Sequence, residues 1–305
     1  MGVIMQAFRR IFLFIVLNLI ICFTASFILS LTGLNKYLQQ HQIQPIALFF
    51  VFFVYGMTGA FISLALSKTI AKWAMKIKII TPYDCSSEGL LLKKIVSQLS
   101  LKAGLGKIPE IGIFSSVTPN AFATGPTTKN SLVAVSTGLL QKLNEEELEA
   151  VIGHEIAHIK NGDMVTMTLL QGVVNTFVIF LSYILSQLIS MHARRGRQEQ
   201  NFGVYLISRI VLDTIFMAIG SIILCSFSRY REYKADLGGA LLSSKEQMIR
   251  ALRRLEQTSA SIEKEETPQS VAALMCNGKK SFMELFSTHP PIEKRVAALQ
   301  IAQIP

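Results

Sequence analysis

Cysteine and charge are both scarce in this sequence. Its 305 residues include four cysteines, and Asp, Glu, Lys and Arg together make up only 16%. The cysteines are scattered, with no C-x-x-C pair, at Cys22, Cys85, Cys225 and Cys276. This spacing argues against a disulfide framework or a cysteine-ligated metal site, so we expect reduced or buried thiols. Half of the residues are hydrophobic and the mean hydropathy is positive, which favours an integral membrane protein over a soluble one.

Acidic residues are also fewer than basic ones. Thirty Lys and Arg against 20 Asp and Glu leave a net charge of +10, a balance shared by many nucleic-acid-binding proteins. The basic residues, however, cluster beside apolar runs, where the positive-inside rule for membrane helices accounts for them. The sequence has no basic stripe with interleaved aromatic residues. We therefore expect the lipid bilayer, and no nucleic acid, as a partner.

Two long apolar runs open the chain. The first, at about 11–34, follows Arg9 and Arg10, and the second, at about 45–67, is followed by four lysines between positions 68 and 78. Each run is long enough to cross a bilayer, and the first is too long for a cleavable signal peptide. Because basic residues flank the outer ends of both runs, residues 1–79 are expected to form a transmembrane hairpin with both ends in the cytoplasm.

Two further apolar stretches, within residues 164–228, are interrupted by polar side chains. The stretch at 164–191 contains Gln171 and Asn175, and the stretch at 202–228 contains Arg209 and Asp213. Ionisable groups at membrane depth are costly and are normally paired or face a cavity. The arginine-rich link between the two stretches would lie outside if both cross, against the positive-inside rule. The sequence leaves two possibilities open, a membrane-spanning pair and a partly buried helical hairpin.

The remaining segments, 80–163 and 229–305, have the composition of a soluble domain. Hydrophobic periodicity predicts one helix and three strands, at 91–99, 111–114, 120–123 and 132–135. The middle strand is expected to close at Gly125-Pro126, and Ser243 with Glu246 predicts a capping box that opens a later helix. A helix, a small sheet and a further helix, in this order, are expected of a zincin-type domain.

One pentapeptide indicates a chemistry, His154-Glu155-Ile156-Ala157-His158. Residues four apart share one face of an α-helix, so both imidazoles can bind one metal ion, with Glu155 as general base. Asn144 with Glu147 predicts a capping box that begins this helix, and Asn161-Gly162 predicts its end. A helix with two solvent-facing histidines would show the same pentapeptide, but the flanking caps and apolar stripe favour the metal site.

A catalytic zinc site requires a third protein ligand. His41 and His192 lie in predicted membrane loops, which leaves His289 or a carboxylate. Glu232 is the best carboxylate candidate because it follows the second apolar pair directly. Asp236, four residues on, shares its helical face and could accept the N–H of a ligating histidine. An ordinary charged helix face would show the same spacing.

Together these segments resemble a known family. The stretches 154–163, 231–236 and 287–291 are similar to the motifs of HtpX-type bacterial membrane metalloproteases, which are relatives of the CAAX prenyl proteases. The resemblance covers nearly the whole chain. It implies a zinc endopeptidase of the bacterial inner membrane, with one Zn²⁺ per subunit and its active site facing the cytoplasm. It also implies misfolded or damaged membrane proteins, or unfolded polypeptides, as substrates in quality control, and Glu232 as the third ligand beside His154 and His158.

The expected fold is mostly α and membrane-integral. The amino-terminal hairpin joins an α+β zincin-like (gluzincin) protease domain, and the second hydrophobic pair is inserted between the zinc ligands. His289 is the candidate donor to the oxyanion, with helix capping as its other interpretation. Asn120, Ala121, Phe122 and Ala123 resemble the edge strand that holds extended substrates in related zinc peptidases, although a plain core strand would have the same sequence.

Three other functions are compatible with parts of this pattern. An intramembrane protease would place the pentapeptide inside an apolar run, whereas charged residues flank it here. A CAAX-type prenyl-peptide processing protease would share the motifs and differ in its substrate. A non-catalytic membrane scaffold would not require Glu155.

Overall fold

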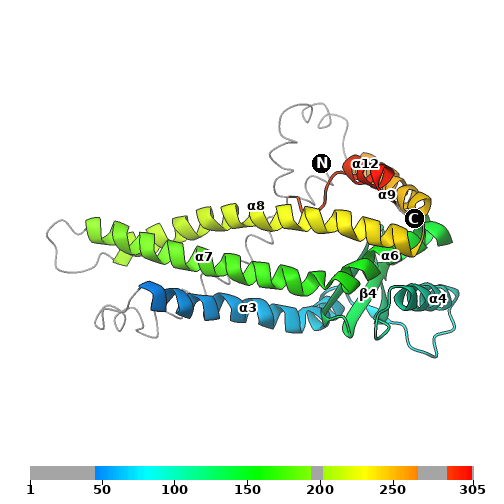
Figure 1. Ribbon diagram of the computed structural model, residues 1–305, viewed down its shortest axis with the longest axis horizontal. Coiled ribbons are helices and arrows are strands. Elements are labelled where there is room, and N and C mark those ends of the chain that lie inside the picture. Colours follow the sequence, from blue (N-terminus) through cyan, green and yellow to red (C-terminus); the bar gives the residue numbers. More distant parts are fainter. Residues whose placement is uncertain (1–44, 194–201, 267–286, 304–305) are drawn as a thin grey trace. The chain divides into compact units, whose positions relative to one another are not determined.

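The computed structural model describes residues 45–193, 202–266 and 287–303 of the chain. The predicted helix at 11–34 lies outside these residues. The described part is mostly helical and contains one small sheet (Figure 1). Its elements are α3 (Pro45–Ala74), β1 (Lys78–Ile79), α4 (Ser87–Lys102), β2 (Glu110–Phe114), β3 (Ala121–Thr127), β4 (Asn130–Ser136), α5 (Thr137–Lys142), α6 (Glu145–Asn161), α7 (Asp163–His192), α8 (Phe202–Leu242), α9 (Lys245–Glu266) and α12 (Ile292–Ile301).

These elements form two compact units. The first comprises Ser63–Met167 and the described residues from Ser226 onward, and it contains the sheet. The second comprises the described residues up to Ile62 together with Thr168–Cys225. We call them the sheet unit and the helical unit.

The sheet unit is built on four strands in the order β1-β2-β4-β3. β2 and β4 are parallel, while β1 and β3 are antiparallel to their neighbours. The predicted strands are found, but the expectation that Gly125-Pro126 closes the middle one is wrong, since β3 continues to Thr127. A register shift between Thr124 and Thr127 accommodates the proline, which cannot donate to a ladder. β3 is an edge strand.

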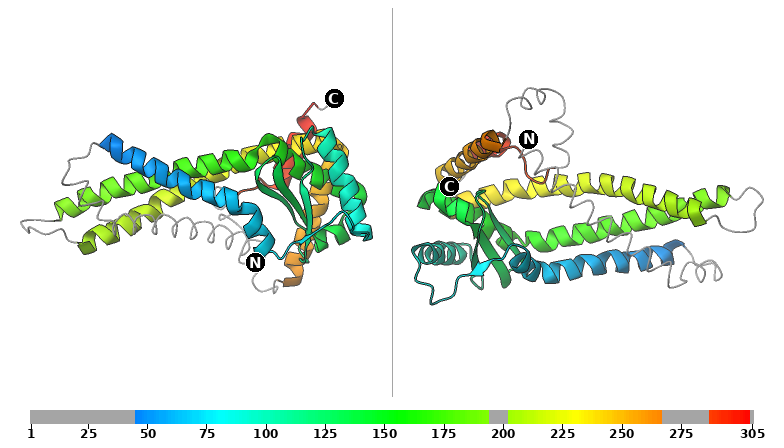
Figure 2. Two further views of the ribbon diagram at one scale, coloured as in Figure 1. Left: turned by 90° about the horizontal axis from the view of Figure 1, so that it is seen from below. Right: turned by 180° about the vertical axis from the view of Figure 1, so that it is seen from behind.

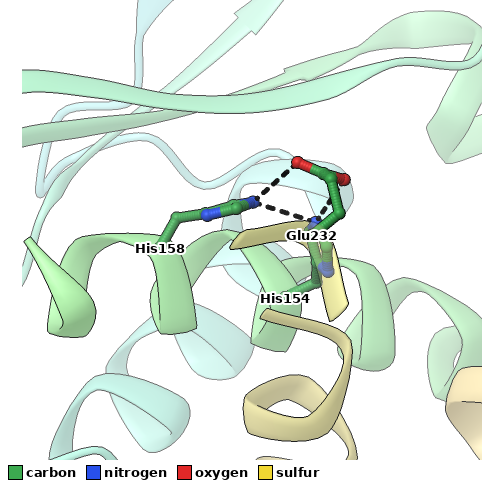
Figure 3. Close-up of side chains that lie close together, drawn as sticks. All are labelled: His154, His158 and Glu232. Atoms are coloured by element: carbon green, nitrogen blue, oxygen red, sulfur yellow. Dashed lines mark hydrogen bonds and ion pairs between the residues drawn. The ribbon is translucent and has the colours of Figure 1, made fainter. Parts of the chain in front are cut away.

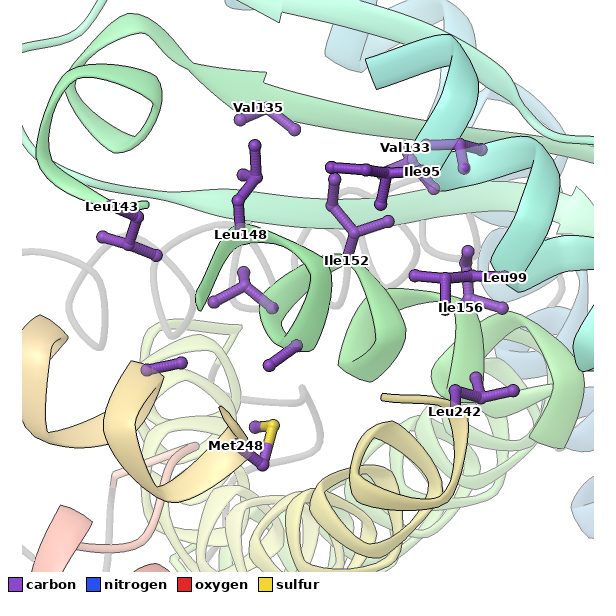
Figure 4. Close-up of a cluster of buried hydrophobic side chains, with 14 of the residues drawn as sticks. Ile95, Leu99, Val133, Val135, Leu143, Leu148, Ile152, Ile156, Leu242 and Met248 are labelled. Carbon is purple, nitrogen blue, oxygen red and sulfur yellow. The ribbon is translucent and has the colours of Figure 1, made fainter. Parts of the chain in front are cut away.

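The core of the sheet unit lies between the sheet and its helices. α6 packs against β3 and β4, and α4 and α9 pack against α6 (Figure 1 and Figure 2). Leu148, Ile152 and Ile156 repeat at helical spacing and are fully buried in this core (Figure 4). Each such side chain stabilises the fold by about 1.5–3 kcal/mol through the apolar surface it buries. This packing fixes which face of α6 points away from the core.

The ends of α6 are set by its sequence. Asn144 accepts from the Glu147 N–H and the Glu147 carboxylate accepts from the Asn144 N–H, so the predicted capping box is confirmed. Gly162 ends the helix in the left-handed region with φ 67°. The second predicted capping box is wrong in register by one residue. Ser244, not Ser243, caps α9 by accepting from Gln247 N–H, because α8 runs on to Leu242 and the Ser243 hydroxyl donates to its Gly239 carbonyl.

The second predicted apolar helix, at 45–67, continues to Ala74 as α3. Lys68 and Lys72 lie one turn apart on its last part and both reach Glu110 of β2, at 2.7 and 2.6 Å. Lys68 also donates to Asn130 at 2.8 Å. These contacts within the sheet unit explain why the helix does not end where its apolar residues do.

The helical unit buries polar side chains beside apolar ones, and it exposes many large apolar side chains. Along α7, Ser182, Ser186 and Ser190 are buried, whereas Phe177, Leu181, Leu185 and Leu188 are exposed. Arg209 and Asp213 of α8 are buried and paired at 3.2 Å. Three described helices are long and apolar enough to cross a membrane, Ala47–Ala74, Asp163–His192 and Phe202–Leu242. A surface rich in apolar side chains, with the ionisable pair kept inside, suits a lipid environment.

Candidate active site

Three side chains from two helices point their donor atoms at one another. His154 and His158 lie one turn apart on α6, and Glu232 lies on α8 (Figure 3). The two Nε2 atoms are 3.1 Å apart. Glu232 Oε1 lies 3.4 Å from His158 Nε2, and Oε2 lies 3.6 Å from His154 Nε2. The structure thus brings together the two histidines of the pentapeptide and the carboxylate 74 residues beyond His158.

The spacing of these donors fits a metal ion. Tetrahedral coordination with bonds of about 2.0–2.1 Å places neighbouring donors about 3.3 Å apart, and the three observed distances lie on either side of that value. Two imidazoles and one carboxylate form a donor set common in catalytic zinc sites, which keep a fourth position open. Each of the three residues can supply one ligand atom to the same ion.

The electrostatics of the site also favour a cation. Burial on its own would lower the pKa of His154, but the carboxylates of Asp236 and Glu232 outweigh it and raise the pKa to about 10. The pKa of His158 is raised in the same way, by Asp163 and Glu232 against the effect of burial. Carboxylates in a buried place therefore stabilise positive charge between the imidazoles, and a metal cation can take the place of the proton.

A carboxylate lies close to the Nδ1 atom of each histidine. Asp236 Oδ1 lies 2.9 Å from His154 Nδ1, within ion-pair distance although the two groups are not aligned as a hydrogen bond. Asp163 Oδ2 lies 2.5 Å from His158 Nδ1. Such partners fix the ring orientation of metal-binding histidines. The sequence reasoning named Asp236 for this position but missed Asp163, whose signal is its place just past the Gly162 turn.

Two side chains of the carboxy-terminal segment complete the surroundings. Arg295 of α12 donates to both oxygens of Asp236, at 2.7 and 2.5 Å, and its Nη1 lies 3.7 Å from Glu232 Oε2. His289 Nδ1 lies 2.7 Å from the same Glu232 oxygen, and its side chain is 61% exposed. Arg295 was not foreseen from the sequence, which offers only an apolar helix pattern there. The oxyanion role of His289 stays a prediction.

A pocket of about 150 Å³ opens beside the donors. Glu155 lines it together with His154 and Glu232, so the predicted base shares a pocket with two of the three donors. The other lining residues are Pro119, Asn120, Ala121, Leu139, Val151, Met248, Ala251, Leu252, Leu255, His289 and Arg295.

The four predicted substrate-binding residues are divided by the structure. Asn120 and Ala121 line the pocket. Phe122 points to the other face of the sheet and packs against Phe114, with ring centroids 5.7 Å apart. Ala123 packs against the core that contains α6. Only the amino-terminal end of β3 therefore reaches the pocket with its side chains.

Known proteins were found that are similar to this chain. Residues 87–303 match Peptidase family M48. The chain is 44% identical over 298 residues to a Protease HtpX homolog from Bacillus velezensis and 45% identical over 295 residues to Protease HtpX from Shewanella oneidensis; each match covers 96% of this chain and 99% of the relative. Among solved structures, the crystal structure of S. mikatae Ste24p matches with a TM-score of 0.58 at 18% identity, covering 93% of this chain and 66% of that one.

The identity to the HtpX proteins extends over nearly the full length of both partners, so it includes the apolar helices as well as the site. The likeness to Ste24p concerns the fold. The family match spans α4 to α12, the part of the chain that supplies His154, Glu155, His158 and Glu232. The chain belongs to peptidase family M48 and is a membrane metalloprotease of the HtpX type.

Proposed function

We propose that this protein is a zinc endopeptidase that hydrolyses peptide bonds of misfolded or damaged membrane proteins, in quality control at the bacterial inner membrane. The observation that carries the proposal is the triangle of donors formed by His154, His158 and Glu232, with Glu155 in the adjoining pocket. His154, His158 and Glu232 would hold the zinc ion. When bound, zinc acidifies a water molecule toward neutral pH and polarises the scissile carbonyl.

Glu155 is the proton carrier of the reaction. It follows His154 directly on α6 and lines the same pocket as His154 and Glu232, which is the place where the attacking water and the scissile bond would meet. It takes the proton from the water and delivers it to the leaving amine. Arg295 and His289 both line the same pocket and are candidate donors to the oxyanion.

The edge of the sheet supplies a backbone site for the substrate. The Asn120 carbonyl accepts from Ser136 N–H of β4 at 2.9 Å, and hydrogen-bonded pairs alternate along an antiparallel ladder. Ala121 and Ala123 are therefore the residues whose N–H and C=O point away from β4. Within the described ranges no strand pairs with β3 on that side. An extended segment of substrate can add there as a further strand and pass over the pocket.

One wall of the pocket is apolar and favours apolar side chains of the substrate. It is formed by Met248, Ala251, Leu252 and Leu255 of α9, together with Val151 of α6. A space of about 150 Å³ suits a single side chain of the substrate, and burying a leucine-sized group contributes about 1.5–3 kcal/mol to its binding. Membrane proteins that have lost their fold expose many such residues, so the wall supports this substrate class.

The arrangement of the helices supports a site on the cytoplasmic side of the membrane. α7 and the apolar first part of α8 lie between His158 and Glu232, and two crossings there would return the chain to the side it left. Lys68 and Lys72 lie in the last part of α3, and Lys76 and Lys78 follow it, so the positive-inside rule favours the cytoplasm on this side.

Metal content and proteolysis, measured on one preparation, test the proposal. Wild type purified in detergent should contain one zinc ion per chain and cleave an unfolded membrane protein. A chelator should abolish cleavage and added zinc should restore it. Glu232→Gln should lose both metal and cleavage, whereas Glu246→Gln, the same change on the exposed surface of α9, should lose neither. A wild type that cleaves without metal would refute the proposal, and cleavage of only prenylated peptides would favour a CAAX-type enzyme.

A further inference from the structure

Two adjacent glycines lie where the ligand-bearing helices cross. Gly238 and Gly239 are near the end of α8, inside the helix, and they face α6. Glycine in a helix interior is less favourable than alanine by about 1 kcal/mol per residue. A helix with two successive glycines therefore loses stability, which must be offset by another interaction. The contacts of the two glycines with α6 indicate which interaction that is.

The two helix backbones are in direct contact at this point. A Cβ atom added to Gly239 would lie 2.9 Å from the backbone nitrogen of His154 and 3.1 Å from its Cα. A Cβ atom added to Gly238 would lie 2.6 Å from the Cβ of Ala157. On α6, a Cβ atom at Gly153 would lie 3.3 Å from the Gly239 carbonyl. At Gly238 and Gly239 a methyl group would therefore force the helices to shift, and at Gly153 it would fit only tightly. Small residues permit such a close approach of two helices.

The crossing is part of the same short stretch that carries the ligands. Gly239 comes three residues after Asp236 and seven after Glu232, about two helical turns. Its nearest contact is the backbone of His154, itself a proposed ligand. The distance between α6 and α8 here therefore sets the distance between the imidazoles and the Glu232 carboxylate, now 3.4 and 3.6 Å. A shift of a few tenths of an ångström between the helices would be passed on to the donor triangle.

We propose that Gly238 and Gly239 are positioning residues whose lack of a side chain holds Glu232 within coordination distance of His154 and His158. This inference rests on the proposed zinc function. It makes a prediction that ordinary helix packing does not, because the methyl group that Gly238 excludes would meet only one neighbour, Ala157. Moving that methyl group from α6 to α8 should leave the helix separation unchanged.

The experiment compares four variants by zinc affinity and by thermal stability. They are Gly238→Ala, the swap Gly238→Ala with Ala157→Gly, Gly239→Ala and Gly220→Ala. Gly220→Ala is the matched control, because its Cβ would lie 2.5 Å from Val174 Cγ1 within the helical unit. It is twelve residues from Glu232 on the same helix, which is about 18 Å along the axis. Zinc affinity is measured by titrating metal-free protein in detergent against a competing chelator, and cobalt absorption reports the coordination geometry.

Gly238→Ala should bind zinc about 10–100-fold more weakly, the range found when the groups around metal ligands are disturbed. The swap should restore the affinity and the cobalt spectrum of the wild type. Gly239→Ala should also weaken zinc binding, because its added methyl group would meet the backbone of His154. Gly220→Ala should lower stability and leave zinc affinity unchanged.

Wild-type affinity in folded Gly238→Ala would overturn the inference. A swap variant that fails to fold, or that folds and still binds zinc weakly, would also overturn it. In either case the effect of a methyl group at position 238 would not come from its contact with the methyl group of Ala157. A wild type that binds no zinc would instead refute the proposed function, so the two failures are distinguishable.

Discussion

The Asp236 carboxylate contacts both His154 and Arg295. Replacing it should separate its effect on zinc binding, through His154, from its effect on stability, through Arg295. It is almost fully buried, lies 2.9 Å from His154 Nδ1 and accepts two hydrogen bonds from Arg295. Asp236→Asn keeps the size of the side chain but removes its charge and one acceptor oxygen. The histidine then loses the group that orients it, and the buried guanidinium loses its counter-charge.

The two effects differ in size and in the quantity that reports them. Loss of the orienting carboxylate should weaken zinc binding about 10–100-fold, or about 1.4–2.7 kcal/mol. Leaving one member of a buried ion pair uncompensated costs up to about 3–5 kcal/mol of stability. Glu232 Oε2, 3.7 Å from Arg295 Nη1, offsets part of this cost. The metal-free variant should therefore unfold at a temperature several degrees lower than metal-free wild type, in addition to its loss of zinc affinity.

Competition titration with a chelator gives the zinc affinity, and unfolding of the metal-free protein gives the stability. Asp163→Asn is the comparison, because Asp163 supports the other histidine. It should weaken zinc binding to a similar extent with a smaller loss of stability. Arg295→Gln added to Asp236→Asn should recover stability but not zinc affinity. The reasoning fails if Asp236→Asn binds zinc as tightly as wild type, or if Arg295→Gln destabilises that variant further.

Three other predictions concern the sheet unit and its surroundings. Partial burial on its own would raise the pKa of Glu110, but Lys68 and Lys72 hold this pKa below the ordinary 4.5. The extra stability of wild type over Glu110→Gln should therefore be present at neutral pH and be lost as the pH falls below 4.5. A difference in stability that grows in acid would contradict this. In a cysteine-free background, the exposed positions Leu90→Cys and Arg253→Cys should be labelled only from the cytoplasmic side of intact cells, and labelling from outside would exclude the proposed topology. Ala251→Leu adds three carbons to the pocket wall and should lower kcat/KM for peptides with large apolar residues while zinc content stays constant; equal turnover of such peptides would place the substrate side chain elsewhere.

The parts of the site that could be predicted from sequence are those fixed by local geometry. Helical spacing places His154 and His158 on one face, and the Asn144–Glu147 box places the start of their helix. The choice between Ser243 and Ser244 as the cap of α9 could not be made in this way. It depends on where α8 ends, and that is decided by the packing of Leu242 in the core.

The parts that could not be predicted depend on distant segments meeting. Nothing near Arg295 in the sequence indicates that it lies against Asp236, 59 residues earlier. The resemblance suggested an edge strand at 120–123, but the strand order that puts β4 between β2 and β3 could not be derived from the residues themselves. The glycines of α8 would be interpreted as a weak point of the helix without the backbone of α6 beside them. Glu232 could be named as the best carboxylate candidate from its place just after the second apolar pair and from the family motif, but its approach to the histidines depends on the fold.

The measurement that tests the account most directly is zinc content and proteolysis of Glu155→Gln beside wild type. Glu155 lines the pocket but is not one of the three grouped donors. The variant should therefore retain one zinc ion per chain and the wild-type zinc affinity. Its turnover of an unfolded membrane protein should fall by about 10²–10⁴-fold, the usual contribution of a general base. Loss of zinc from the variant, or turnover above about a tenth of the wild-type value, would contradict the assignment of Glu155 as the base.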